Sequence, residues 1–427
     1  MTKSHYLLNI LVNALPMLSS NTNIELLVDY DGASLGAYSE EGTSLTCALS
    51  EEPLVDIDYE IHDYNLHFNF GLSNHSEEHK QIKVIIQQTD KKPIPDAIWS
   101  STSPSNCFLE SKVEVTKCPA GYAFTVDLPP MSKRYFSNTM WKPLKNITLK
   151  FDEYVKSNYI HKLNYGKSVL GHDLNAFTLY SKRNEKLPLI CISSGIHPAE
   201  GDTISTVAIT EWLLNEGNHH NSAFDFMIIP VLNPDGFISG KNGCNHNGVN
   251  FFWDFQKYNI QACPEAHYLW NLFQTSPPNI YIDFHSYTTQ GQSKQFGPYL
   301  KNPVLYTSKN TRHISLELSK ELEKIPNSRS QILLSPASLP YNMTKEFNTI
   351  TFAKYHLHQG YGINHMRDLS VEVIEKIIKS SYGCDFTTQI LQPYGPLKRT
   401  FNEIIKQTLY VQRYYLPKKL KRLLEKH

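Results

Sequence analysis

The sequence predicts two domains, an antiparallel β-sandwich followed by an α/β domain with a mixed sheet and helices on both faces. Three observations lead to this prediction. The chain has 427 residues, which is too many for one ordinary core. Residues 24–152 alternate between apolar and polar side chains and show almost no helical periodicity. From about residue 155, short apolar strands alternate with helical stretches, as in α/β layer folds. We therefore expect domains at 1–152 and 153–427.

The first domain contains three clear strand patterns, at residues 66–72, 122–128 and 147–151. Clusters of turn-forming residues, such as 91–96, separate the apolar runs. Short strands with frequent turns predict an antiparallel sandwich. Such a domain could shape access to a site in the second domain, or it could be a packing partner without chemistry.

The second domain is predicted from a change of period. The apolar runs at 187–192, 224–232 and 279–284 have the length and composition of buried strands. A helical pattern follows the first of them and is closed by Gly217. Further helices are expected at 264–275 and 311–325. Strands that alternate with helices indicate a largely parallel or mixed sheet.

Composition and charge exclude several classes of protein. Hydrophobic residues make up 41% of the chain and charged residues 19%, which is typical of a globular protein. The formal net charge is zero, so a nucleic acid is not the expected partner. No run of eighteen or more apolar residues occurs, and we therefore expect no membrane span.

The first residues have two competing interpretations. Residues 6–18 are apolar, but Asn9, Asn13 and Pro16 interrupt the run, so a signal peptide at residues 1–20 is the less favoured interpretation. The seven cysteines are scattered and form no C-x-x-C pair, which excludes a zinc finger and fits a reducing compartment. We therefore expect a cytoplasmic protein. The sequence does not indicate the oligomeric state.

The turn after the apolar run 187–192 carries a candidate metal site. His197 and Glu200 lie three residues apart where this strand gives way to a helix. Ligand sites in open α/β sheets form beyond the carboxyl ends of strands. A catalytic zinc usually has three His, Asp or Glu ligands and one open position. His285, at the end of the run 279–284, supplies the third ligand. We predict one Zn²⁺ per chain.

Four motifs in this order resemble the zinc carboxypeptidases of the M14 type. They are Gly166–Leu174, His197–Glu200, the Asn-Pro-Asp-Gly segment 230–237, and Asp283–Tyr287 with its His-Ser-Tyr sequence. The resemblance covers roughly residues 160–375. A β-domain before such a core resembles the arrangement in the cytosolic carboxypeptidase branch. The resemblance implies a hydrolase that cleaves peptide or acyl-amide bonds with metal-activated water.

The resemblance also implies a glutamate that acts as general base on a late strand. Residues 368–373 alternate, with Leu369, Val371 and Val373 on one side, so Glu372 is the expected base. Glu375 is the competing candidate, and Glu372 could instead be a strand residue facing solvent. The family's tyrosine that covers the substrate has three possible counterparts, Tyr341, Tyr355 and Tyr361.

The sequence departs from the family where the substrate's terminal carboxylate is bound. Phe252 and Trp253 occupy the places of the family's Asn-Arg pair, and Gly243 stands where a further arginine is expected. Asn250 replaces the aspartate that orients the first histidine ligand, and it can accept that hydrogen bond without a charge. A bidentate arginine is the usual means of recognising a carboxylate. Its loss predicts a substrate that lacks a free C-terminal carboxylate.

Three functions therefore remain open. The favoured one is a zinc hydrolase that cleaves a peptide or N-acyl amide bond, with Phe252, Trp253, Tyr287 and Arg367 as substrate-binding residues. The second is a conventional metallocarboxypeptidase in which another cation, such as Arg367, binds the carboxylate. The third is an M14-like domain that binds a ligand without catalysis.

Overall fold

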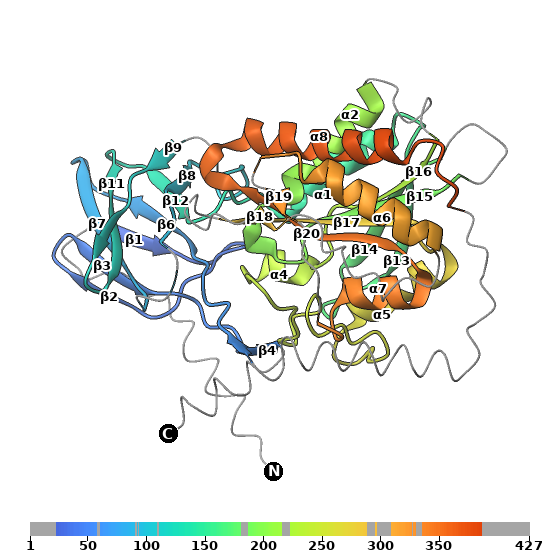
Figure 1. Cartoon of the computed structure of the whole chain (residues 1–427). Helices are drawn as coiled ribbons and strands as arrows, with labels where there is room; N and C mark the ends of the chain where they lie inside the picture. Colours follow the sequence, from blue (N-terminus) through green and yellow to red (C-terminus); the bar gives the residue numbers. More distant parts are fainter. Residues whose placement is uncertain are drawn as a thin grey trace, which may run out of the picture.

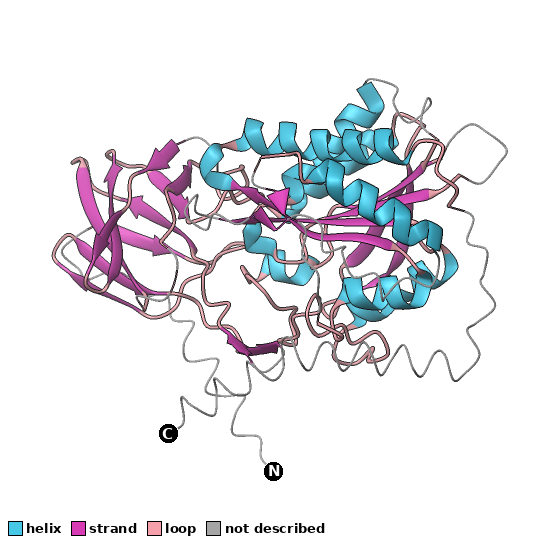
Figure 2. Cartoon of the chain, viewed as in Figure 1, coloured by secondary structure: helices cyan, strands magenta, loops and turns pink. Residues whose placement is uncertain are grey.

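The structure of the chain is a computed structural model. It describes residues 23–57, 60–89, 92, 94–108, 111–180, 187–215, 223–287, 295–296, 309–326, 328–329 and 335–386. Figure 1 shows a sandwich of strands beside a sheet that is covered by helices above and below, and Figure 2 separates the two by their secondary structure. The predicted order of a β-domain and an α/β domain is confirmed. The apolar segment at residues 6–18 lies outside the described residues.

The N-terminal domain is a sandwich of two five-stranded sheets. In spatial order, the first sheet consists of β1 (Ile24–Leu27), β6 (Asn69–Asn74), β12 (Lys133–Ser137), β8 (Ile98–Ser101) and β9 (Ser111–Val113). The second consists of β10 (Thr116–Cys118), β11 (Gly121–Leu128), β7 (Lys80–Gln87), β3 (Ser44–Ala48) and β2 (Tyr38–Glu41). All described pairs in these sheets are antiparallel except β3 with β7. Alternate side chains such as Val84 and Phe124 fill the space between the sheets, as period-two patterning requires.

A small hairpin leaves the sandwich toward the second domain. It consists of β4 (Val55–Ile57) and β5 (Glu60–His62), which pair only with each other. Figure 1 shows β4 below the sandwich and close to the α/β domain. Val55 is buried in a small cluster with Cys244 of that domain. This hairpin and the residues on either side of it therefore form part of the contact between the domains.

The second domain is built on a six-stranded mixed sheet. Its strands, in spatial order, are β13 (His161–Lys167), β14 (Asp173–Leu179), β16 (Asp225–Ile229), β15 (Leu189–Ser193), β17 (Ile280–Tyr287) and β20 (Ile350–His358). The last four strands run parallel to one another. β14 is antiparallel to both of its neighbours, β13 and β16. A two-stranded parallel pair, β18 (Gln295–Phe296) and β19 (Ser328–Arg329), forms a separate small sheet that contacts β20. The carboxyl ends of β15 and β17 are neighbours, so His197 and His285 leave the same edge of the sheet.

Helices cover both faces of this sheet, as the sequence predicts. They are α1 (Leu144–Val155), α2 (Thr203–Asn215), α4 (Pro234–Ile238), α5 (Pro264–Thr275), α6 (Lys309–Leu322), α7 (Leu339–Phe347) and α8 (Ile363–Ser381), with 3-10 turns η1 (Pro198–Glu200) and η2 (Gln359–Tyr361). Ile190 and Ile192 pack with α1, α2, α6 and α8. Leu189 and Cys191 point to the other face and pack with α5 and α7. None of the described helices has the length and apolar character needed to span a membrane.

Two predicted strands are wrong, because both segments are helical. Residues 147–151 belong to α1, where Ile147, Phe151 and Tyr154 are buried at helical spacing. The predicted domain boundary after residue 152 therefore falls inside a helix that packs in the α/β core. Residues 368–373 belong to α8, where Leu369, Val373 and Ile377 recur every four residues. In both segments, apolar and polar residues alternate over a few positions, as they do in a strand. Over the longer segment the apolar residues recur with the 3.6-residue period of a helix, and the segment is helical.

The domains are joined by buried contacts near the edge of the sheet that carries the histidines. Trp141, which is 1% exposed, lies 5.2 Å from the His67 ring and 5.6 Å from the Phe237 ring, centroid to centroid. Gly32 donates a backbone hydrogen bond of 2.7 Å to Ile238. Packing of this kind fixes the position of the sandwich relative to the sheet.

Candidate metal centre

Three side chains from two strand ends converge at the carboxyl edge of the sheet. His197 Nδ1 lies 3.0 Å from Glu200 Oε1, and His285 Nδ1 lies 2.9 Å from Glu200 Oε2. One ligand atom from each residue can be chosen so that all three lie within 4.8 Å of one another. Both histidines are almost fully buried, whereas the Glu200 side chain is 18% exposed. The predicted ligands are thus brought together, with one side still open to solvent.

The local sequence explains why the turn after β15 holds this geometry. Pro198 begins the short turn η1, and Gly201 ends it in the left-handed conformation at φ 66°. Asp202 then accepts a hydrogen bond of 3.0 Å from the amide of Gly195, which closes the loop on itself. The left-handed backbone conformation is readily adopted only by glycine. The turn therefore presents His197 and Glu200 to the same point.

The outer nitrogen of each histidine is bound by a second residue. His285 Nε2 lies 2.9 Å from Asp283 Oδ2, and His197 Nε2 lies 3.3 Å from Asn250 Oδ1. Both partners accept the Nε2–H, so the Nδ1 lone pairs face the Glu200 carboxylate. Three electron-pair donors that point at one another are stabilised when a proton or a metal cation lies between them. The donor set of two nitrogens and a carboxylate is the one that Zn²⁺ prefers in catalytic sites.

The pKa values of His285 and Glu200 show that the cluster favours a positive charge beside the Glu200 carboxylate. Burial opposes a charged His285, but Glu200 and Asp283 outweigh it and raise the histidine pKa to about 9. Burial likewise opposes a charged Glu200, yet His285 and His197 hold the pKa of this carboxyl well below its ordinary value. In the absence of metal, a proton on His285 supplies the charge. A bound metal ion replaces that proton.

Aromatic rings enclose the two histidines. Phe252 is fully buried, with its centroid 6.0 Å from that of His197 and 5.1 Å from that of His285. Trp253 lies edge-on to Phe252 at 4.8 Å and is partly buried. Tyr64 of the sandwich lies 5.6 Å from the His197 ring. Phe252, a predicted substrate-binding residue, is thus a buried side chain that packs against both histidine rings.

Tyr64 is a residue of the site that the sequence analysis did not identify. Burial raises the pKa of its hydroxyl well above the ordinary value, Glu200 raises it further, and the polar side chains of Trp253 and Asn250 lower it. The Tyr64 ring therefore lies beside the ligand His197, within reach of the charge of Glu200. Nothing in the sequence around Tyr64 marks it as functional, because its place depends on contacts between the domains.

The Asn-Pro-Asp-Gly motif is structural in this chain. Asn233 caps α4 by accepting from the amide of Gly236 at 3.0 Å, and its Nδ2 donates to the carbonyl of Cys244 at 3.0 Å. The fully buried Asp235 accepts from Ser168 Oγ at 2.5 Å and from the amide of Leu170 at 2.9 Å. The motif therefore ties the β13–β14 hairpin and the loop before Phe252 to the turn that carries the ligands.

Glu372 does not join this cluster, which corrects the predicted base. Its helix α8 turns the side chain to the surface, where it is 48% exposed and lies 3.5 Å from Lys376. It lines a groove with Glu211 and Arg367. Glu211 is eight residues along α2, roughly 12 Å from the end of the helix that faces the metal site. Glu375, the competing candidate, also lies on α8 and pairs with Lys379 at 3.2 Å.

Arg367 is also placed away from the metal ligands. Its guanidinium donates to Glu211 Oε2 at 2.6 Å on the outer side of α2. Of the possible covering tyrosines, Tyr341 lies on α7, Tyr361 is 49% exposed in η2, and Tyr355 lies within β20. Tyr287 is the last residue of β17, two positions after His285.

Gln359 is a further buried neighbour of the ligands. Its side-chain amide donates to the Glu200 carbonyl at 2.7 Å and to Ser286 Oγ at 2.9 Å. Its oxygen accepts from the amide of Met140, at the end of the sandwich, at 2.6 Å. This residue connects the ligand turn, β17 and the linker between the domains. Gln359 directly follows β20, and no pattern in the sequence around it indicates this role.

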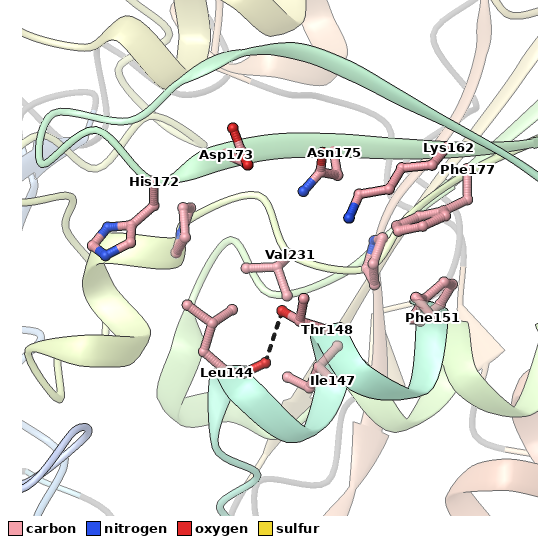
Figure 3. Close-up of a pocket in the computed structure, with 12 residues that line it drawn as sticks. Leu144, Ile147, Thr148, Phe151, Lys162, His172, Asp173, Asn175, Phe177 and Val231 are labelled. Carbon is pink, nitrogen blue, oxygen red and sulfur yellow. Dashed lines mark hydrogen bonds between the residues drawn. The ribbon is translucent and has the colours of Figure 1, made fainter. Parts of the chain in front are cut away.

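A separate pocket of about 230 Å³ lies between α1 and the β13–β14 hairpin. Figure 3 shows Leu144, Ile147 and Phe151 on the helix side, with Lys162 and Asn175 on the strand side. None of the three candidate ligands lines it. This pocket is therefore distinct from the candidate metal centre.

Residues 152–365 match the family Peptidase_M14, described as zinc carboxypeptidase. The chain belongs to this family, and its fold and ligand set are those of a metallocarboxypeptidase-like hydrolase with a site for one metal ion. Cytosolic carboxypeptidase 1 of Xenopus laevis is 26% identical over 163 residues, which cover 36% of this chain and 13% of that protein. The same protein of Gallus gallus is 27% identical over 153 residues, covering 34% and 12%. The matched part is thus about an eighth of those relatives.

Two solved structures share the fold over most of the chain. A metallo-carboxypeptidase from Pseudomonas aeruginosa superimposes with a TM-score of 0.67 at 13% identity, covering 83% of this chain and 98% of that one. One from Burkholderia cenocepacia gives 0.65 at 11% identity, covering 84% and 98%. Each superposition covers more of the chain than residues 152–365, so the structural similarity includes much of the sandwich.

Proposed function

We propose that this chain is a zinc-dependent hydrolase that cleaves an amide bond, either a peptide or an N-acyl bond. The observation that carries this proposal is the convergence of His197 Nδ1, His285 Nδ1 and the Glu200 carboxylate, with Glu200 on the open side. The family membership of residues 152–365 supports it. In this proposal, His197, Glu200 and His285 hold one zinc ion and leave one position for chemistry.

The residues around the ligands have defined tasks in this function. The chemistry that zinc supplies when bound is polarisation of a carbonyl group and activation of water. Asp283 and Asn250 hold the histidine rings in the orientation that presents Nδ1. Phe252 excludes water behind the two rings, and water exclusion strengthens every charge interaction at the site.

The substrate is inferred to lack a free carboxylate at the position that family members grip. Phe252 is apolar and buried, and Trp253 offers one N–H donor. The salt bridge of Arg367 to Glu211 commits that guanidinium to the outer face of α2, which argues against its use as a carboxylate anchor. A carboxylate placed against the aromatic wall would be desolvated without a partner. An amide, an ester or an apolar group is therefore the expected leaving side.

The test is hydrolysis of matched substrates by the zinc-loaded protein. Peptides that differ only in a C-terminal acid or amide, together with N-acyl amino acids, are assayed side by side. The expected result is faster turnover of the amide than of the acid, and loss of both after chelation. A strong preference for the acid that disappears in Arg367→Ala would instead support a conventional metallocarboxypeptidase.

A second candidate is an M14-like domain that binds metal and a ligand without turnover. The observation that favours it is the position of Glu372 on the surface. Among the residues that the structure describes, the carboxylates at the cluster are Glu200, Asp202 and Asp283, and each already serves a histidine or the ligand turn. Stoichiometric zinc without hydrolysis of any of these substrates would support this candidate.

The proposed partners and location follow from the same family. We infer a peptide or acyl-amide substrate, no nucleic-acid partner and a cytoplasmic location. The relatives are named cytosolic carboxypeptidases, and the seven cysteines are all free thiols. Fractionation of cells that produce the tagged chain tests this location.

A further inference from the structure

The sandwich sends one side chain to the metal ligands. Tyr64 follows the β4–β5 hairpin, and its ring centroid lies 5.6 Å from that of His197. Its partly buried ring packs with Trp253 beside Val55 and Cys244. The negative charge of Glu200, the ligand on the open side of the cluster, raises the pKa of the Tyr64 hydroxyl after burial has raised it. The sandwich therefore contributes an aromatic ring with a hydroxyl group beside the candidate metal centre.

The loop of the α/β domain is shaped to receive this ring. A Cβ atom built on Gly243 would lie 2.5 Å from Tyr64 Cδ1, a distance that real Cβ contacts essentially never show. The absence of a side chain at residue 243 thus makes room for Tyr64. The family resemblance leads one to expect an arginine at this position. The two side chains cannot share the space, so the ring takes the place where that arginine would begin.

The approach of Tyr64 is fixed by a buried anchor at the start of the same segment. The Glu52 carboxylate, in a residue that is 8% exposed, accepts from three consecutive backbone amides, those of Asn242, Gly243 at 2.9 Å and Cys244 at 3.1 Å. Asn242 Nδ2 donates in turn to the carbonyl of Tyr64 at 3.0 Å. Three amides on one carboxylate and a return bond to Tyr64 hold the segment and the loop as one unit.

We propose that Tyr64 is a catalytic residue contributed by the sandwich, whose hydroxyl donates a hydrogen bond to the carbonyl oxygen of the bond that is cleaved. This proposal rests on the proposed hydrolase function. Hydrolysis adds one water: a C–O bond forms at the carbonyl carbon, the C–N bond breaks, and the leaving nitrogen takes a proton. Tyr64 keeps its own proton throughout and acts only as a donor to the oxygen on which negative charge develops. Glu52 is a positioning residue, since it acts through the backbone of the loop and not on the substrate.

The experiment compares Tyr64→Phe with the control Tyr382→Phe, a change at a tyrosine that is 70% exposed. Phenylalanine keeps the ring that fills the space at Gly243 and removes only the hydroxyl. We expect an unchanged zinc content of one per chain, a fall in kcat of about 100-fold, and a change in KM of less than about threefold, because one donor to a developing oxyanion is worth ~10²–10³ in rate. A kcat within twofold of the wild type would overturn the proposal.

A second readout does not depend on turnover. Acetohydroxamate is titrated into the Co²⁺-substituted proteins, and binding is followed by the visible absorption of cobalt. The oxygens of this probe occupy the position of a substrate carbonyl, so we expect about tenfold weaker binding to Tyr64→Phe. If the wild type binds the probe more tightly than the variant but hydrolyses nothing, the hydrolase function fails and the donor role of Tyr64 stands. If the wild type and Tyr64→Phe bind the probe equally well and both hydrolyse substrate, the hydrolase function stands and the donor role of Tyr64 is overturned.

A steric variant tests the same contact from the other side. Gly243→Ala places a methyl group against the Tyr64 ring and must displace it. We expect a loss of kcat of at least about tenfold in the wild-type background and little further loss in Tyr64→Phe, since the hydroxyl is already absent. Full additivity of the two changes would show that Gly243 acts independently of Tyr64 and would contradict the proposed contact.

Discussion

The central sheet and the sandwich reach the same site by different means. The sheet contributes through strand ends: Ser193 and Asp283 are paired in the parallel register of β15 and β17, so His197 and His285 follow from neighbouring strands. The sandwich contributes through the segment from Glu52 to Tyr64, which lies outside its two main sheets. The first arrangement is set by backbone pairing. The second depends on a few long-range hydrogen bonds and one close-packed ring.

This difference separates the positions that define the metal from those that define its surroundings. Strand register places ligand atoms with little freedom, as a metal requires. The sequence and position of a docked segment can vary from one protein to another without loss of the metal ligands. In this chain the sandwich segment and the aromatic residues Phe252 and Trp253 surround a ligand set of the ordinary family type. The comparison leads to four predictions.

The largest effect is expected from removing a strand-end ligand. His197→Ala should weaken zinc binding by about 1,000-fold, since losing even a residue that orients a ligand costs ~10–100-fold in affinity. Zinc per chain is measured by metal analysis after dialysis against a weak chelator. The control is His75→Ala, a half-exposed histidine of the sandwich that pairs with Glu25. Retention of wild-type zinc in His197→Ala would place the metal elsewhere.

The next effect concerns the anchor of the sandwich segment. Glu52→Ala should lower the free energy of unfolding by about 3 kcal/mol, because a buried unsatisfied donor costs ~1–3 kcal/mol and three amides lose their acceptor. Zinc content should remain near one per chain. Denaturant unfolding of the zinc protein measures the change, with Glu51→Ala as the exposed neighbour for control. A loss no larger than that of the control would mean that the segment is not held by Glu52.

A smaller and graded effect is expected from pH. Glu200 and Asp283 overcome burial and raise the pKa of His285 to about 9 in the metal-free protein, so a proton competes with zinc below that pH. Zinc affinity should therefore rise about tenfold per pH unit from pH 6.5 and level off near pH 9. Competition with a chelator of known affinity measures it. An affinity that does not change between pH 6.5 and 8.5 would show that zinc binding displaces no such proton.

The smallest effect is expected at Glu372. Because this side chain lies on the surface of α8 beside Lys376, Glu372→Gln should leave zinc content unchanged and alter kcat/KM by less than about twofold. The matched change Glu200→Gln, at a ligand, should remove most of the zinc. A 100-fold loss of activity in Glu372→Gln would contradict the position of α8 described here.

The sequence alone determined the parts that depend on local pattern. The strand-turn-helix unit around His197 and Glu200 was predictable because an apolar run, a proline turn and a helical period follow one another within 30 residues. The α5 helix was predicted at its observed bounds for the same reason. His285 could be assigned because an apolar run that ends in histidine has the form of a buried parallel strand.

Only the tertiary structure decided the surroundings of the metal site. Whether residues 368–373 form a strand or a helix was ambiguous over six residues, and packing of α8 against α2 and α6 resolves it. The contacts between Glu52 and Asn242 join residues 190 positions apart, and no local pattern records such a pairing. Tyr64 is an ordinary residue in sequence. It belongs to the site because folding brings a loop without a side chain at Gly243 against its ring.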